Sequence, residues 1–119
     1  MTLRVDMQTL PHRFQRYNTV GDWMGDEKHR VIFVSEMSNN DYEFLVGLHE
    51  LIEQALCLKR NITDAEVTKF DKSFKGEEPG DSPDAPYFKE HRFATKIEKM
   101  VCKELGISWI KYCEFLDSL

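Results

Sequence analysis

Two residues that can bind a metal ion, His49 and Glu53, lie four positions apart in an apolar stretch of the chain. In an α-helix, residues at this spacing lie one above the other on the same face. That face also carries Val46 and Leu56, so we expect the pair on or beside the apolar stripe of the helix. A carboxylate in that position has to be paired, hydrogen-bonded or bound to a metal, because burying it alone costs several kcal/mol or raises its pKa.

A second pair, His91 and Glu98, repeats this pattern further along the chain. The two residues are seven positions apart, which is two helical turns, and Ala94 between them leaves room above the backbone. The apolar stripe continues through Val101 and Leu105, so both polar side chains are predicted to point toward the core. If the two helices pack together, two imidazoles and two carboxylates converge, and this ligand set suits zinc, iron or manganese.

The segment His-Glu-Leu-Ile-Glu at residues 49–53 resembles the metal-binding helix of the zincins, except that Glu53 stands where zincins have a second histidine. The resemblance implies that His49 and Glu53 are metal ligands and that Glu50 is the catalytic general base. It also implies His91 as the third ligand. Glu98 would then be a fourth ligand, or the partner that holds an imidazole in its tautomer.

The order of motifs is similar to that of small uncharacterised bacterial and phage proteins. Those proteins pair a His-Glu-Leu-x-Glu helix with a downstream Pro-Tyr-x-x-Glu-His segment, which correspond here to residues 49–53 and 86–91. The likeness extends over about residues 21–116 and implies a shared fold and site. A predicted strand at residues 31–35 precedes the first motif, as the substrate-lining edge strand does in small zincins.

These motifs predict a metal-binding domain, with zinc or another divalent transition metal as cofactor, that acts as a metal-dependent hydrolase if an open coordination position remains. The substrate would be a small molecule or a peptide that offers a carbonyl or phosphoryl oxygen to the metal. Four protein ligands would close the open position, so the number of ligands decides between a catalytic and a structural metal.

Two alternatives stay open at the level of sequence. The four His and Glu residues can form a buried hydrogen-bonded network without a metal, in a phage or bacterial interaction protein that binds and inhibits a host protein. Glu50 can be an exposed helix residue, because its neighbours Gly47 and Gln54 mark a polar side. The three cysteines, Cys57, Cys102 and Cys113, are expected to be reduced thiols in apolar patterns.

The first third of the chain has the short hydrophobic period of β-strands, at residues 3–7 and 30–35, with residues 13–18 as a further candidate. Glycine and aspartate at residues 21–26 predict a turn region around Trp23. The expected result is a small N-terminal sheet of about three strands, mostly antiparallel.

The rest of the chain has the long period of helices. We expect helices at residues 41–59 and 87–105, a shorter one after the Thr63 and Glu66 capping box, and a last one after Ser108. Residues 75–86 hold three of the four prolines and predict a loop that could cover the site. The predicted fold is therefore a single α+β domain over residues 1–119, zincin-like, with the sheet packed on three to four helices.

Composition limits the remaining function classes. The 119 residues include 16 Lys and Arg and 21 Asp and Glu, for a formal net charge of −5. This balance argues against a duplex nucleic acid as partner, because that role needs clustered cations. The sequence has no apolar run of the roughly 20 residues that a membrane helix needs and no secretory signal pattern, so we expect a cytoplasmic protein with no membrane partner.

Overall fold

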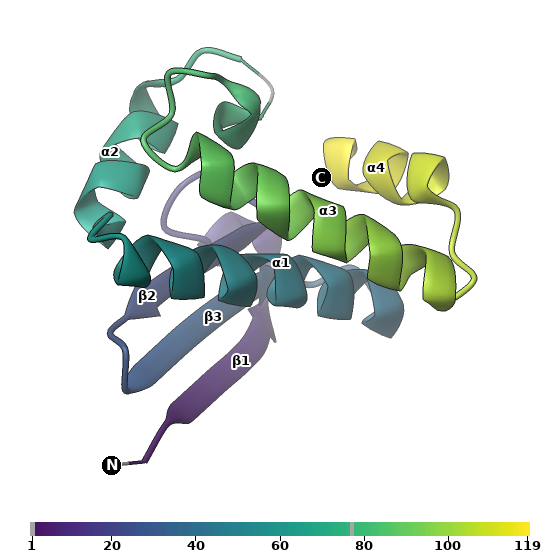
Figure 1. Ribbon diagram of the computed structural model, residues 1–119. Coiled ribbons are helices and arrows are strands. Elements are labelled where there is room, and N and C mark those ends of the chain that lie inside the picture. The colour runs from purple at the N-terminus through teal and green to yellow at the C-terminus, as the bar shows by residue number, and fades with distance from the viewer. Residues whose placement is uncertain (1, 77) are drawn as a thin grey trace.

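The chain folds as a three-stranded β-sheet and four α-helices, the α+β class expected from the sequence (Figure 1). The computed structural model describes residues 2–76 and 78–119, so Glu77 of the predicted loop lies outside the described residues together with Met1. Helix α1 (Asn40–Lys59) lies across the sheet, and helix α3 (Phe88–Glu104) packs along α1. Helix α1 is therefore held between the sheet and α3.

The sheet is mixed, which corrects the predicted antiparallel arrangement. Its strands are β1 (Arg4–Leu10), β2 (Gly21–Gly25) and β3 (His29–Ser35), in the order β1-β3-β2. Strands β2 and β3 are antiparallel, but β1 pairs with β3 in parallel along its whole length. Parallel neighbours need a crossover connection of a dozen or more residues, and residues 11–28, which include β2, supply it here.

The second correction concerns which segment pairs with β3. Residues 13–18 are not a strand: they follow from a short 3₁₀ turn (His12–Phe14) into a series of bends. The strand is instead the segment Gly21–Gly25, where a turn was expected. Trp23 explains this choice, because its indole is 2% exposed in the core whereas Phe14 of the rejected segment is 62% exposed. Burying so large an apolar side chain favours the pairing that places it inside.

Helices α1 and α3 begin and end within one residue of the bounds that the sequence predicts. The capping box of Thr63 and Glu66 is present at the start of α2 (Asp64–Ser73), and the side chain of Ser108 caps α4 (Trp109–Asp117). Between α2 and α3 the predicted loop contains one short 3₁₀ turn, η2 (Pro79–Asp81). This turn lies directly on α3, since a Cβ atom added at Gly80 would come within 2.4 Å of Cγ of His91.

The hydrophobic core lies between the sheet, α1 and α3. Ile32 and Val34 of β3, Leu45 and Cys57 of α1, and Cys102 of α3 are each at most 1% exposed. Cys57 and Cys102 are free and fully buried, which confirms their expected role as small core residues. Because α1 and α3 share this core, the polar side chains on their facing sides are positioned by the same packing that stabilises the fold.

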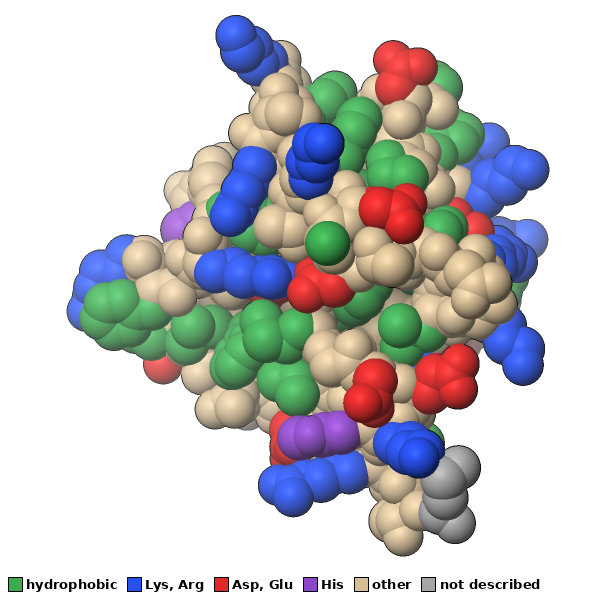
Figure 2. Space-filling view, turned by 90° about the vertical axis from the view of Figure 1, so that its left-hand side faces the viewer, with side chains coloured by type: hydrophobic (Ala, Val, Ile, Leu, Met, Phe, Trp, Pro, Cys, Tyr) green, Lys and Arg blue, Asp and Glu red, His purple; other side chains and the backbone are tan. Residues whose placement is uncertain are grey.

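The surface of the described residues bears on the predicted partners. None of the described helices combines the length and the hydropathy that crossing a bilayer requires. On the face shown in Figure 2, Lys and Arg side chains are scattered among acidic and hydrophobic ones. That face therefore lacks the continuous basic patch on which binding to duplex nucleic acid depends.

Candidate metal centre

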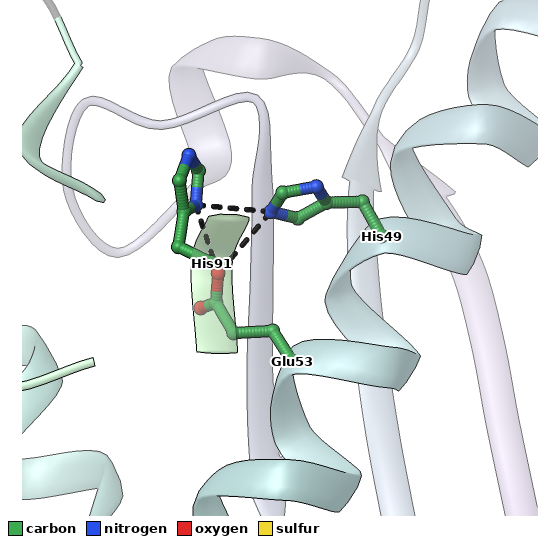
Figure 3. Close-up of side chains that lie close together, drawn as sticks. All are labelled: His49, Glu53 and His91. Atoms are coloured by element: carbon green, nitrogen blue, oxygen red, sulfur yellow. Dashed lines mark hydrogen bonds and ion pairs between the residues drawn. The ribbon is translucent and has the colours of Figure 1, made fainter. Parts of the chain in front are cut away.

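Three side chains from α1 and α3 bring one ligand atom each to a common point (Figure 3). Nε2 of His49 lies 3.1 Å from Oε2 of Glu53, and both atoms lie 3.1 Å from Nδ1 of His91. The three residues are 4–7% exposed. The structure thus forms a nearly equilateral triangle of two imidazole nitrogens and one carboxylate oxygen inside the protein.

Local sequence and helix packing explain how the triangle arises. The spacing of His49 and Glu53 places them on one face of α1, as the sequence predicts. His91 lies near the start of α3, which packs along α1 and directs the imidazole toward them. Gly80 lets η2 approach the His91 ring from the other side, in a space that no larger side chain would leave.

The outward-facing atom of each triangle residue has a partner of its own. Nδ1 of His49 lies 2.8 Å from Oε1 of Glu98, and Trp23 Nε1–H donates to Oε1 of Glu53 at 3.1 Å. Nε2 of His91 lies 3.3 Å from Oδ1 of Asp81. A carboxylate beside one ring nitrogen favours the proton on that nitrogen. With its proton on the outer nitrogen, each neutral imidazole would turn an unprotonated nitrogen toward the triangle.

Hydrogen bonds alone do not satisfy this triangle. If both histidines are protonated on their inner nitrogens, each can donate to Glu53, but two N–H groups then face each other across 3.1 Å. If one inner nitrogen is unprotonated, it accepts from the other histidine and its contact with the carboxylate oxygen joins two acceptors. A cation at the common point removes this conflict, because all three atoms then direct lone pairs at it.

The distance of 3.1 Å between the ligand atoms also fits metal coordination. At zinc–ligand distances of about 2.0–2.1 Å, ligand atoms lie about 3.3–3.4 Å apart in a tetrahedron and about 2.9 Å apart at octahedral angles. The observed 3.1 Å lies between these values. Two histidines and one carboxylate on one side of an ion leave at least one position open, the arrangement of catalytic rather than structural sites.

Glu98 lies behind His49 rather than in the triangle. One of its oxygens is bonded to Nδ1 of His49, and the other accepts a 2.5 Å hydrogen bond from the Tyr112 hydroxyl. Glu98 is 6% exposed and Tyr112 is fully buried. Helix α4, which carries Tyr112, thereby fixes Glu98, and Glu98 fixes the orientation of the His49 ring.

Glu50 lies beside the triangle and is not exposed, contrary to the alternative of an exposed helix residue. Its side chain is 13% exposed, and its Oε2 lies 3.8 Å from Nε2 of His49. The expected polar side is also absent, because Gln54 is fully buried and donates to the carbonyl of Met24. Burial, followed by the negative charge of Glu53, raises the pKa of Glu50 well above its usual value. Gly21 of β2 leaves the room that this carboxylate occupies.

The protonation of the triangle differs from that of free side chains. Burial opposes the charged form of His49, but hydrogen bonds to Glu53 and Glu98 outweigh it and raise the pKa of His49 well above 6.5. The same balance raises the pKa of His91. Burial opposes ionisation of Glu53, but its bonds to the two histidines lower its pKa to about 2. Protons therefore substitute for a cation while no metal is bound.

The triangle lies in the wall of a pocket of about 640 Å³. Sequence reasoning identified the triangle residues and Glu98 but missed Trp23, Asp81 and Tyr112 as their partners. These three come from β2, η2 and α4, so no spacing along the chain connects them with α1. In the sequence, Trp23 lies in a predicted turn region, Asp81 in the predicted loop and Tyr112 in the last predicted helix, so none of them pointed to the site.

Comparison with known proteins gives no match: no family model, no curated protein and no solved structure is similar to this chain.

We predict that Tyr112→Phe destabilises the fold although the ring is kept. The substitution removes the donor to the second Glu98 oxygen and leaves a buried carboxylate oxygen without a partner, which costs about 1–3 kcal/mol. Urea unfolding measures this loss. Tyr42→Phe is the matched control, because the Tyr42 ring packs 5.1 Å from that of Tyr112 and none of the described residues bonds its hydroxyl. A Tyr112→Phe protein as stable as the control would contradict the linkage through Glu98.

We also predict opposite effects of pH on the metal-free and the zinc-loaded protein. Without metal, the raised pKa of His49 means that its contribution is complete below about pH 6.5 and is lost as pH rises through its folded pKa. The lowered pKa of Glu53 gives a contribution that is present above about pH 4.5 and lost as pH falls toward 2. Metal binding displaces protons and strengthens with pH.

The gap between the two melting temperatures, measured with zinc and with a chelator, should therefore widen from pH 6 to pH 8. A gap that is constant or narrows with pH would contradict the assignment of protons and metal to the same three atoms.

Proposed function

We propose that this protein binds a divalent transition metal, with zinc as the first candidate, through His49, Glu53 and His91. We propose further that the protein acts as a metal-dependent hydrolase. One observation carries the proposal: three buried ligand atoms lie 3.1 Å from one another, and each ligand is held from behind by a separate partner. Such outer partners are the usual companions of metal ligands, where they fix tautomer and orientation.

The zincin-like assignment belongs to this proposal and rests on the motif at residues 49–53. It is supported by the place of Glu50, which follows the first ligand in the sequence and lies beside the triangle in space. The ligand set itself, two nitrogens and one oxygen, also suits iron(II) or manganese. Zinc comes first because two histidines and a glutamate are an established set for catalytic zinc.

A bound divalent ion would supply Lewis-acid activation of water and of the substrate oxygen. Glu50 is the group of this chain suited to take the proton of that water, because burial holds its pKa above the usual carboxyl value. Glu98 keeps the His49 ring in the required tautomer, and Trp23 keeps Glu53 turned toward the centre. Each of these polar groups around the triangle therefore has a separate role in the proposed site.

The alternative function is an interaction protein in which the same cluster only stabilises the fold. It differs from the metal proposal in one measurable property, the metal content of the purified protein.

We expect the protein purified without an affinity tag or chelator to contain about one zinc, iron or manganese ion per chain, measured by elemental analysis. His91→Ala removes a ligand and should abolish this content. His29→Ala is the matched control, because His29 is an exposed histidine on β3 that pairs with Asp6 far from the triangle. Glu98→Gln keeps all three ligands and should weaken binding by about 10–100-fold. Absence of metal after reconstitution, or full retention in His91→Ala, would refute the site and favour the interaction protein.

Glu50→Gln should separate metal binding from hydrolysis. Since Glu50 is not a ligand in the proposed set, the variant should keep its zinc. Loss of the general base should lower the rate of hydrolysis of a chromogenic amide or ester by about 10²–10⁴-fold. Glu104→Gln, at the exposed end of α3, is the control for a lost carboxylate. A Glu50→Gln protein that is fully active with zinc bound would exclude Glu50 as the base.

A further inference from the structure

The charge of the pocket around the triangle indicates which substrates can enter it. We infer that the substrate carries a positively charged group, such as an amine or a guanidinium, next to a carbonyl centre, and is not a phosphate ester. This inference rests on the proposed function and narrows the carbonyl or phosphoryl substrate that the motifs left open.

The charged side chains that line the pocket are acidic. Besides Glu53 and Glu98, five carboxylates line it: Glu50, Asp71, Glu78, Asp81 and Asp117. No Lys or Arg of the described residues contributes to its lining. A divalent ion would balance two negative charges, and Glu98, Asp81 and Asp117 would still line the pocket, so its lining stays acidic after the metal is bound. Pockets lined by charge of one sign concentrate ligands of the opposite sign.

Phosphate-binding sites have a different composition. They use Arg or Lys side chains, or the free backbone N–H groups of a helix N-terminus, to balance the charge of the phosphate. Here the nearby arginines are already bound elsewhere. Arg16 forms ion pairs with Asp22 and Asp64, and Arg60 pairs with Glu90 on α3. A phosphate in this pocket would therefore find no Lys or Arg side chain among the described residues of the lining.

The acidic side chains are concentrated at one end of the pocket. The triangle residue His91 and Glu98 are two turns apart on α3, about 10 Å along the helix axis. Asp81 lies 3.3 Å from the His91 ring, and Glu78 accepts a hydrogen bond from Gly80 in the same turn. Asp71 of α2 lines the pocket with them. The positively charged group of the proposed substrate is therefore expected to bind beside η2 and α2.

The other end of the pocket is less polar. Near Glu98 its wall is formed by α4, with Trp109 and Leu116 in the lining, and Asp117 is the one carboxylate of that helix that lines it. An apolar group of the substrate fits this end. A substrate that spans the triangle would thus place a cation on the side of His91 and an apolar group on the side of Glu98, as an amide or peptide with one basic residue can do.

Binding of three small probes tests the inference without relying on turnover. Phenethylammonium, phenethyl alcohol and phenyl phosphate each carry an aromatic ring, with a positive, a neutral and a negative group respectively. Their binding to the zinc-loaded protein can be followed by the fluorescence of Trp109, which lines the pocket, and Trp23, which contacts Glu53. We expect phenethylammonium to bind at least tenfold more tightly than the alcohol and phenyl phosphate to bind most weakly.

Substitutions at the acidic end of the pocket test where the ammonium group of the probe binds. Glu78→Gln, alone and combined with Asp81→Asn, should reduce the preference for phenethylammonium over the alcohol by at least threefold. Asp84→Asn removes an exposed carboxylate that follows η2 but does not line the pocket, so it should leave the preference unchanged. Zinc is measured in every sample, because Asp81 contacts the His91 ring.

The two proposals can fail separately. A protein that holds zinc but binds the three probes equally, or binds phenyl phosphate best, overturns the inference and leaves the metal site in place. Release of zinc by phenethylammonium also overturns it, since the cation would then occupy the triangle itself. A protein that holds no zinc overturns the proposed function, whatever the probes show.

Discussion

The carboxylate of Glu53 is buried at the meeting point of β2, α1 and α3, and its charge has to be balanced there. One oxygen accepts from Trp23 of β2, and the other contacts His49 of its own helix and His91 of α3. A buried carboxylate without these partners would be strongly destabilising. The strand pairing that buries Trp23 and the packing of α3 on α1 therefore both contribute to balancing this one charge.

The same constraint ties the candidate site to the fold. Helix α1 lies between the sheet and α3, and the candidate ligands His49 and Glu53 lie in one row with the core residues Leu45 and Cys57 at four-residue spacing, so the candidate site borders the hydrophobic core. Helix α4 is joined to the site through Tyr112 and Glu98, and the turn η2 through Asp81. Every element around the triangle thus positions at least one polar group, as expected for a preorganised site.

The electrostatics extend from the triangle into the pocket. Carboxylates line it without any Lys or Arg from the described residues, and the nearby arginines are bound in ion pairs outside it. The proposed metal at the triangle and the proposed cationic substrate beside η2 both follow from this one charge distribution. The excess of 21 acidic over 16 basic residues in the sequence gave no indication that the acidic side chains gather here.

The sequence by itself determined what depends on neighbours within about four residues. Helical periodicity and capping residues gave α1 and α3 nearly residue by residue, and the spacing of His49 and Glu53 placed them on one face. The nature of the ligands followed from their residue types, and His91 from the apolar stripe on which it lies.

Only the tertiary structure decided which distant groups meet. The parallel pairing of β1, the strand at Gly21–Gly25 and the burial of Glu50 were not predicted, nor were the contacts of Trp23, Asp81 and Tyr112 with the site residues. Trp23 and Glu53 are 30 residues apart, and Tyr112 and Glu98 belong to different helices. Such contacts depend on the burial of large side chains and on the balance of buried charge over the whole molecule. A local sequence pattern does not contain this information.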